Sequence, residues 1–412
     1  MRKYRYPSIG VALVIALSLL LQGIGAASAA RSNASTGMKG QIVIGQITSM
    51  SGAFAVYGQE QIQGFQAGLH YATNGKMKVD NAKIVVKDYS DVPSSGTTPD
   101  PATAVTQAKS AIQNDHAQIL QCCASSASAI AVAGVAKDFK KILMVAPAAD
   151  DSIAGINRYT FRTSRESTQD ARTGALYAAK KFGKRYVTLA QDYVFGHGQV
   201  DAWKAQLDTV HATDLADIYF PLTATDFTPY IQRILAMKPD WVFLACAGAQ
   251  CVSLAKALDQ QGVLDSTQVM TGLGNIASFP AYGTAGTKLA YISVYYYKFP
   301  KTMANAYLVK YIQQHYNRPA DIFDQDSFAA AQQIVAALKK THSTAAGKMI
   351  KALEGQTVHG PKGDYTIRKQ DHVCLQPMYI AALTSNGTNF TAKLLATRSP
   401  KQTAPPIQTH NW

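Results

Sequence analysis

Strand-like runs alternate with helical segments along most of this chain, and this alternation restricts the possible folds more than any other feature. In the first unit, the β-branched run "QIVIGQIT" (41–48) reads as a buried strand, "MSGAFAVYG" (50–58) as a small-residue loop, and 59–73 as an amphipathic helix. Apolar strands separated by helices favour parallel sheets that are covered on both faces. Further strand-like runs lie at 83–90, 117–121, 141–148, 185–192, 216–222, 240–248, 267–272 and 289–297.

The strand-like runs are too many for one sheet, and the pattern restarts after "NRYTFRTSRES" (157–167). We therefore predict an α/β fold with two doubly wound parallel-sheet lobes in a chain of 412 residues. Residues 374–398 are predicted to form a terminal hairpin that turns at "SNGT". The closing segment, 398–412, has no apolar periodicity and is expected to be a loose tail.

Residues 1–29 have the layout of a signal peptide. Basic residues precede the short apolar run "VALVIALSLLL", and Ala27-x-Ala29 offers a cleavage site. The run is short for a membrane span. No cysteine stands near the cleavage site, so a lipid anchor is not expected. The mature protein is expected to be soluble and exported, either to the periplasm or to the medium.

The formal net charge of +14 raises the question of a nucleic-acid partner. Lys and Arg are scattered over apparent polar helix faces, without a basic tail or a basic-aromatic stripe. Charged residues make up only 16% of the chain, so the imbalance reflects few acids. We expect a solvated surface, no nucleic-acid partner and a monomer.

Five cysteines in an exported chain permit two disulfides and one remaining thiol. Cys246 and Cys251 are close enough for a short-loop bridge at a strand-to-helix turn. Cys122 and Cys123 are adjacent, and pairing of one of them elsewhere is equally compatible with the sequence, while Cys374 is interpreted as buried. No histidine stands at zinc-finger spacing from either pair, so no metal and no other cofactor is expected.

Enzyme motifs are mostly missing: the chain has no G-x-S-x-G elbow, no P-loop and no H-E-x-x-H. "TGLGNIA" (271–277) matches a dinucleotide fingerprint weakly, but the following "SFPAYG" (278–283) is not expected to be a helix. We predict a protein without catalytic residues.

Small polar loops follow six of the predicted strands, which is where α/β proteins bind ligands. In "SSASA", Ser125 and Ser126 present hydroxyl groups beside the free N–H groups of a helix start, a natural cradle for a carboxylate. The alternative for these serines is plain helix capping. The six loops lie at 49–58, 121–129, 145–152, 191–198, 246–251 and 271–275.

From about Gln41 to Leu395 the chain resembles the type I periplasmic binding proteins of ABC importers, in the branch of the leucine/isoleucine/valine-binding proteins. The resemblance implies two lobes (40–161 plus 295–373, and 162–294 plus 374–397) that close over a small amino acid or carboxylate and deliver it to a membrane permease. The segments that carry it, in order, are "MSGAFAVYGQEQIQG", "DYSD…PATAV", "SSASAIAVAGVAK", "VAPAADDS", "RYTFRTS", "DYVFGHG", "TDFTPYIQRI" and "KGDYTIRKQDHVCLQPMYI".

The family's ligand-binding positions transfer to five matching residues. The hydroxyl that binds the ligand carboxylate matches Ser126, with Ser125 beside it, and a backbone position in the next loop matches Ala148. The aromatic residues of the two lobes match Tyr57 and Phe195.

Three positions depart from the family pattern. Asp150 replaces a threonine, Ala247 replaces a tyrosine, and Leu273 replaces the glutamate that neutralises the ligand ammonium. Either Asp150 supplies the missing charge from the first lobe, or the ligand is an aromatic or other organic acid without an amine. A ligand-sensing receptor or regulator domain of the same fold is the alternative to transport.

Overall fold

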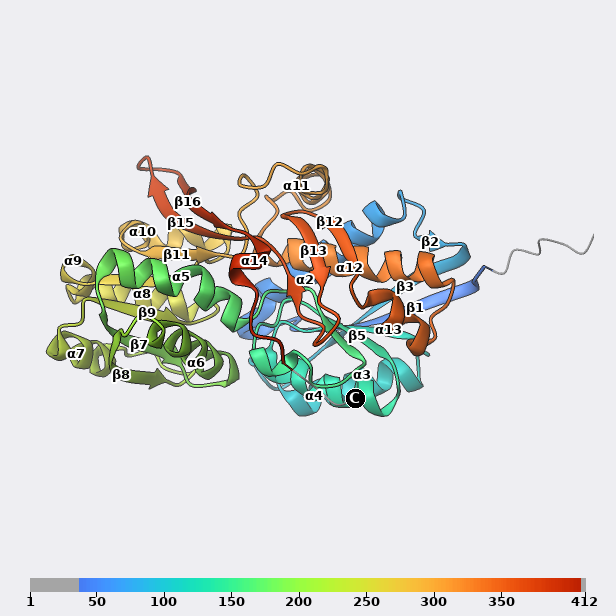
Figure 1. The fold of residues 1–412 in the computed structure, drawn as a ribbon, viewed down its shortest axis with the longest axis horizontal. Coiled ribbons are helices and arrows are strands. Elements are labelled where there is room, and N and C mark those ends of the chain that lie inside the picture. Colours follow the sequence, from blue (N-terminus) through green and yellow to red (C-terminus); the bar gives the residue numbers. More distant parts are fainter. Residues whose placement is uncertain (1–36, 409–412) are drawn as a thin grey trace, which may run out of the picture.

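The computed structural model describes residues 37–408, which form two α/β lobes lying side by side (Figure 1). The expected signal peptide, 1–29, lies outside the described residues. The α/β fold with mostly parallel sheets is confirmed. In the described part of the chain no helix is both long and apolar enough to cross a membrane.

The first lobe is built on a six-stranded sheet in which only the edge pair β2–β3 is antiparallel. The central strand β1 pairs in parallel with β3 and β4, placing Ile44 beside both Val86 and Ile119. The strand order is β2 (Lys78–Val79), β3 (Asn81–Ser90), β1 (Lys39–Thr48), β4 (Ile119–Cys122), β5 (Ile142–Val145) and β6 (Thr160–Arg162).

Helices cover both faces of this sheet. On one face, Gly64 and Gly68 of α2 pack so tightly on α12 that a Cβ atom at Gly64 would lie 2.2 Å from the Asp324 carbonyl oxygen. The helices of that face are α2 (Ala55–Ala72), α12 (Ile322–Thr341) and α13 (Ala346–Leu353), with α11 (Met303–Tyr316) outside them; α3 (Pro101–Gln113) and α4 (Ser126–Asp138) cover the other face.

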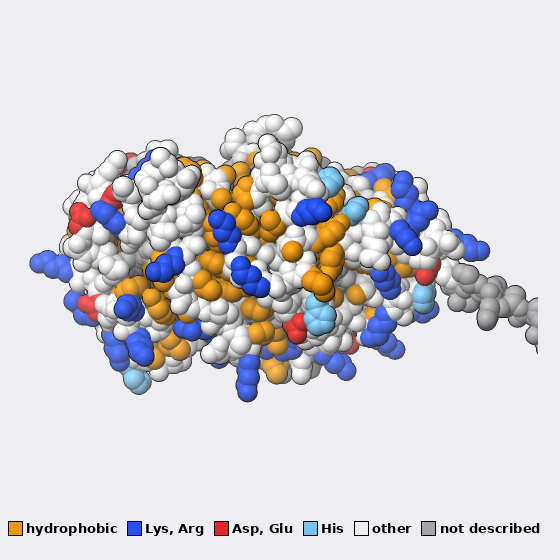
Figure 2. All heavy atoms as spheres, turned by 90° about the horizontal axis from the view of Figure 1, so that it is seen from above, with side chains coloured by type: hydrophobic (Ala, Val, Ile, Leu, Met, Phe, Trp, Pro, Cys, Tyr) orange, Lys and Arg blue, Asp and Glu red, His pale blue; other side chains and the backbone are white. Residues whose placement is uncertain are grey.

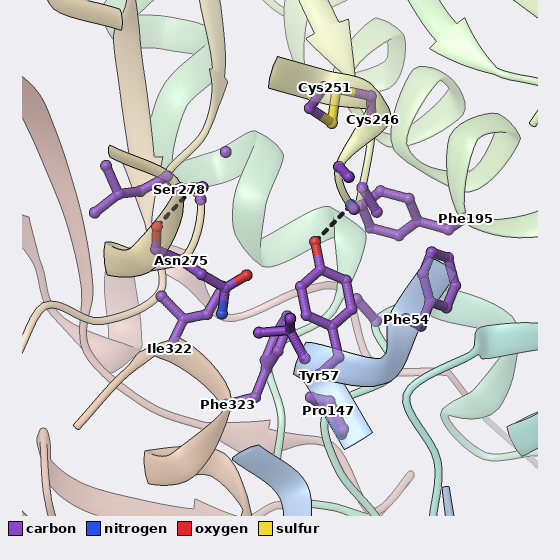
Figure 3. A pocket seen from close by; sticks show the side chains of 18 of the residues that line it. Phe54, Tyr57, Pro147, Phe195, Cys246, Cys251, Asn275, Ser278, Ile322 and Phe323 are labelled. Carbon is purple, nitrogen blue, oxygen red and sulfur yellow. Dashed lines mark hydrogen bonds between the residues drawn. A yellow bond between two sulfur atoms is a disulfide. The ribbon is translucent and has the colours of Figure 1, made fainter. Parts of the chain in front are cut away.

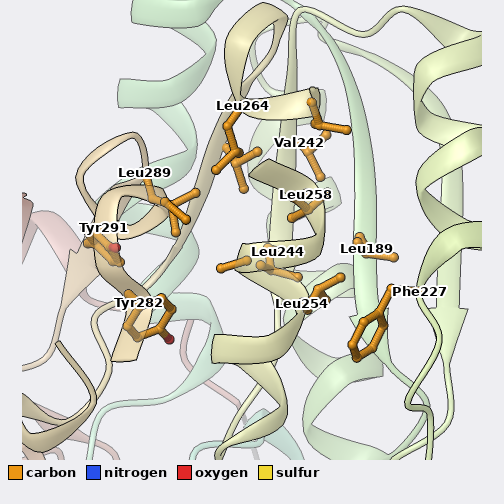
Figure 4. Close-up of a cluster of buried hydrophobic side chains, with 14 of the residues drawn as sticks. Leu189, Phe227, Val242, Leu244, Leu254, Leu258, Leu264, Tyr282, Leu289 and Tyr291 are labelled. Atoms are coloured by element: carbon orange, nitrogen blue, oxygen red, sulfur yellow. The ribbon is translucent and has the colours of Figure 1, made fainter. Parts of the chain in front are cut away.

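The second lobe has a seven-stranded sheet, parallel except where β15 and β16 add the predicted C-terminal hairpin. One face packs against α7, α8, α9 and α10 (Figure 4), the other against α5 and α6. The strand order is β16 (Phe390–Arg398), β15 (Met378–Ser385), β11 (Ala290–Ser293), β10 (Gln268–Gly272), β9 (Trp241–Ala245), β7 (Arg185–Gln191) and β8 (Thr213–Phe220). The helices are α5 (Ser167–Phe182), α6 (Val194–Asp208), α7 (Thr228–Met237), α8 (Gln250–Gln260), α9 (Val263–Ser266) and α10 (Phe279–Thr287).

Three features differ from the sequence predictions. Phe279–Thr287 is helical (α10), although the segment was not expected to be, and Gly283 interrupts its helical backbone. A small antiparallel sheet was missed, consisting of β12 (Thr357–Gly360), β13 (Gly363–Ile367) and β14 (Cys374–Leu375).

The C-terminal segment also differs, because residues 399–408 are not a loose tail. Ser399 forms a capping box at the start of α14 (Pro400–Thr403), which packs against α5. The Arg368 guanidinium donates to the Pro405 carbonyl at 2.7 Å, and the Gln408 N–H donates to Asp371 at 3.1 Å. Polar contacts with the first lobe therefore hold this segment in place.

The surface seen from above carries scattered Lys and Arg side chains, as the sequence predicts, and hydrophobic side chains across its middle (Figure 2). The cysteines pair Cys246 with Cys251 and Cys122 with Cys123, and Cys374 is a buried free thiol. Of the two possibilities left open for Cys122 and Cys123, the structure has the bond between neighbours.

Candidate ligand-binding cavity

A cavity of about 550 Å³ lies between the two lobes, at the carboxyl ends of their parallel strands (Figure 3). Loops of both lobes contribute to its wall, as expected for a ligand site in this class of sheet. Six of the eight predicted site residues line it: Tyr57, Ser126, Ala148, Phe195, Ala247 and Leu273.

The other two predicted residues, Ser125 and Asp150, are outside the wall and act as helix caps. The Ser125 hydroxyl accepts from the Ser128 N–H at 3.4 Å. Asp150 Oδ1 accepts from the Ser152 N–H at 3.0 Å. Asp150 Oδ2 is so close to Gly198 of α6 that a Cβ atom on this glycine would lie 2.2 Å from it. The Asp150 carboxylate thus lies against helix α6 and is not part of the cavity wall.

Ser126 and Ala148 differ in what they can offer a ligand. Ser126 Oγ accepts from the Ala149 and Asp150 N–H groups, both at 3.3 Å, which leaves its own proton available to an acceptor. The Ala148 N–H donates to the Cys123 carbonyl at 3.0 Å, and the Ala148 carbonyl accepts from Arg162 at 2.9 Å. The backbone of Ala148, predicted to bind the ligand, is therefore engaged within its own lobe.

Aromatic rings form much of the wall, and Tyr57 lies among them. Its ring centroid is 5.5 Å from that of Phe54 and 4.7 Å from that of Phe323. The Tyr57 hydroxyl accepts from the Gly248 N–H of the second lobe at 2.6 Å, a bond that joins wall residues of the two lobes (Figure 3). Burial raises the pKa of Tyr57 to about 12, so the phenol keeps a proton that it can donate.

The loop that holds Gly248 connects β9 to α8 and is closed by the Cys246–Cys251 disulfide. Gly248 has φ of +76°, a conformation that other residues adopt at a cost. A Cβ atom there would also come within 3.2 Å of the Ala53 carbonyl oxygen of the first lobe. The glycine thus allows the two lobes to approach each other closely.

Among the polar wall residues that sequence reasoning missed, Arg165, Asp170 and Gln199 form one cluster. Arg165 Nε donates to Asp170 Oδ1 at 3.3 Å, and Gln199 Nε2 donates to Asp170 Oδ2 at 2.8 Å. All three side chains are buried. The segment "RTSRES" contains Arg165, and a charged residue at a lobe crossing is the signal that could have revealed it.

Buried carboxylates of the first lobe bind the second lobe beside the cavity. Glu60 of α2 accepts from the Asn275 side chain and from the Phe323 N–H, the latter at 3.0 Å. Asp321, the residue before α12, accepts from the Ile276 N–H at 2.6 Å. Burial raises the pKa of Glu60 well above its usual range and that of Asp321 to about 7.

These contacts join the lobes in a closed arrangement, because Asn275 and Ile276 follow β10 of the second sheet. On the first-lobe side, Arg318 pairs with Asp324 at 2.7 Å.

Within residues 37–408, no group of three or more His, Cys, Asp or Glu side chains is arranged to hold a metal ion.

Comparison with known proteins identifies the family. The family described as "Periplasmic binding protein" matches residues 41–388. A Leu/Ile/Val-binding protein homolog 6 of Brucella melitensis is 25% identical over 366 residues, covering 86% of this chain and 90% of its own length. The Leu/Ile/Val-binding protein BraC3 of Rhizobium johnstonii is 27% identical over 343 residues, covering 79% and 89%.

Solved structures agree with this assignment. An ABC-type branched-chain amino acid transporter of Rhodopseudomonas palustris has a TM-score of 0.75 and 33% identity, covering 90% of this chain and all of its own (100%). A solute-binding protein of the same species in complex with 4-hydroxybenzoate has a TM-score of 0.79, with 22% identity and coverage of 87% and 97%, and it supports the fold. The chain therefore belongs to the periplasmic binding proteins, which are solute-binding proteins of ABC transporters.

Proposed function

We propose that this protein captures a small carboxylate ligand, an amino acid or an organic acid, in the cavity between its lobes and hands it to a membrane permease. The observation that carries the proposal is Ser126, which stands at the start of α4 with a free hydroxyl proton and lines the cavity. A hydroxyl group beside helix N-terminal N–H groups favours a negatively charged ligand group.

Binding would act through closure of the lobes. Ligand that touches both lobes binds the closed form better than the open form, so it shifts the equilibrium toward closure. The Tyr57–Gly248 and Asp321–Ile276 hydrogen bonds would form at the same time, because each joins one lobe to the other. The closed shape is then what the permease recognises.

The proposal includes export to the periplasm, removal of residues 1–29, a monomeric state and no catalytic step. Mass spectrometry of the secreted protein tests the cleavage after Ala29. Sedimentation of the purified protein with and without ligand tests the monomer.

A thermal-shift screen of amino acids and organic acids tests the function. We expect at least one carboxylate to raise the melting temperature, and small-angle X-ray scattering with that compound to show a smaller radius of gyration. The carboxamide of the same compound is the matched control and should bind more weakly. A screen in which no carboxylate stabilises the protein, or a scattering profile unchanged at saturation, contradicts the proposal.

A further inference from the structure

The cavity wall carries two charged side chains among the described residues, Arg165 and Asp170, and they are not equally available. Both oxygens of Asp170 already accept hydrogen bonds, from Arg165 and from Gln199. An ammonium group placed there would also face the Arg165 guanidinium, which repels it. Asp170 is therefore a poor partner for the amino group of a ligand.

Arg165 has donors to spare. The residue is 7% exposed, and its side chain donates from Nε to Asp170 and from Nη1 to the Pro147 carbonyl at 3.3 Å. A guanidinium group has five N–H donors, and Nη2 of Arg165 has no hydrogen-bond partner within residues 37–408. A buried guanidinium with unused donors favours a carboxylate, which it can bind with two parallel hydrogen bonds.

Two hydroxyl groups of the wall also act as donors toward the cavity. The Ser126 oxygen is occupied by two backbone N–H groups, and the Tyr57 oxygen by the Gly248 N–H. Each hydroxyl keeps its own proton for the ligand. Arg165 and Ser126 both contact the loop after β5, through Pro147 and Ala149, so they approach the ligand from the same side.

Apart from Asp170, no carboxylate among the described residues lines the cavity. Leu273, a wall residue, is an apolar side chain of the second lobe's core. The Asp150 carboxylate lies against α6 and is not part of the cavity wall. Leaving an ammonium group buried without a partner is unfavourable.

We propose that the ligand is a carboxylic acid with an apolar body and no ammonium group, and that the Arg165 guanidinium binds its carboxylate together with the Ser126 hydroxyl. The inference rests on the proposed capture of a carboxylate in this cavity and narrows its chemistry. The rings of Phe54, Tyr57 and Phe323 then surround the apolar body of the acid.

Matched ligand pairs test the absence of the ammonium group. We would measure binding of 4-methyl-2-oxopentanoate against L-leucine, and of phenylpyruvate against L-phenylalanine, by calorimetry on the purified protein, with benzoate as an additional acid. We expect an acid to bind at least about tenfold more tightly than its amino-acid counterpart. Equal affinity, or tighter binding of the amino acid, overturns this inference and leaves the proposed function intact. If no member of any pair and no other carboxylate binds, the proposed function fails.

Variants test the role of Arg165 itself. Arg165→Gln should weaken binding of the best acid by at least about thirtyfold and should abolish the preference for the acid over its carboxamide. Loss of that preference distinguishes a ligand contact from a purely structural role, which would weaken both compounds alike. Arg368→Gln is the matched control, since Arg368 pairs with Asp371 at 2.6 Å outside the cavity wall. An unchanged acid-to-carboxamide preference in folded Arg165→Gln overturns the assignment.

Discussion

Closure of the lobes should take up protons, because it buries carboxyl groups that the open form would expose to water. Glu60 is 2% exposed in the closed arrangement, and its two oxygens accept from the Asn275 side chain and the Phe323 N–H. Asp321 stands beside it and accepts from the Ile276 N–H. When the lobes separate, Asn275 and Ile276 move away and water can replace them.

The sign of the effect follows from the direction of the pKa shifts. Burial, with the Asp321 charge as the next cause, raises the pKa of Glu60, and burial raises that of Asp321 to about 7. Since the closed form then binds more protons than the open form between the ordinary carboxyl pKa and the raised one, low pH favours closure. Ligand affinity should rise as the pH falls from about 8 to about 6. This gain in affinity should disappear when the pH is raised through the pKa of the closed form.

The magnitude is set by the number of protons taken up. Uptake of one proton per closure changes the affinity by at most about tenfold per pH unit. Because Glu60 and Asp321 interact, and Arg318 with Asp324 offsets part of the charge, we expect between half a proton and one. The affinity should therefore increase by roughly tenfold to a hundredfold between pH 8 and pH 6.

Calorimetry in two buffers of different ionisation enthalpy measures this proton uptake, using a ligand that stays ionised over the whole range. Glu60→Gln removes one of the two titrating groups and should reduce both the uptake and the pH slope by about half. Glu354→Gln makes the same chemical change near His372, 3.6 Å away and outside the cavity wall, and should keep the wild-type slope. Zero uptake in the wild type, release of protons, or an unchanged slope in Glu60→Gln would refute the reasoning.

The remaining predictions concern the wall and its supports. Ser126→Ala should weaken ligand binding by about tenfold or more, since a hydrogen bond to a charged group contributes about 1.5–3 kcal/mol; calorimetry that gives wild-type affinity removes Ser126 from the site. Asp150→Asn should change ligand affinity by less than about threefold and lower the free energy of unfolding by about 1 kcal/mol, because Asp150 caps a turn. Denaturant titration measures the stability change. Loss of amino-acid binding in this variant would instead make Asp150 the counter-ion of the ligand ammonium group. Replacing Cys246 and Cys251 by serine should destabilise the protein by about 2 kcal/mol in denaturant melts, and wild-type stability would show that the bridge has no such role.

Much of the fold was predictable because its strands are apolar runs between amphipathic helices. The small sheet β12–β14 was missed since its strands are short and β14 has only 2 residues. Helix α10 begins with a proline in its first turn and contains Gly283 at a non-helical conformation, so its sequence reads as a loop. The segment after Arg398 is held by caps and by Arg368 rather than by an apolar stripe, so periodicity could not reveal it.

Placement of the cavity followed from topology, because the ends of parallel strands meet at one edge of each sheet. Topology did not predict which side chains of these loops point into the cavity. Asp150 is in the expected loop, yet its carboxylate caps the Ser152 N–H and is not part of the cavity wall. Arg165 and Asp170 come together with Gln199 from two different helices and a crossing segment, a juxtaposition that no local pattern encodes.

The state of the cysteines makes this protein suited to site-specific labelling. All five cysteines of the chain lie in the described part, four of them are paired, and burial raises the pKa of the Cys374 thiol to about 12. Maleimide reagents attack exposed thiolates, so the native protein should be nearly inert to them. Val56 and Val194, which are 49% and 37% exposed, lie in the first turns of helices α2 and α6 of opposite lobes. A cysteine introduced at each position would accept a fluorophore pair, turning lobe closure into an optical signal for solute concentration.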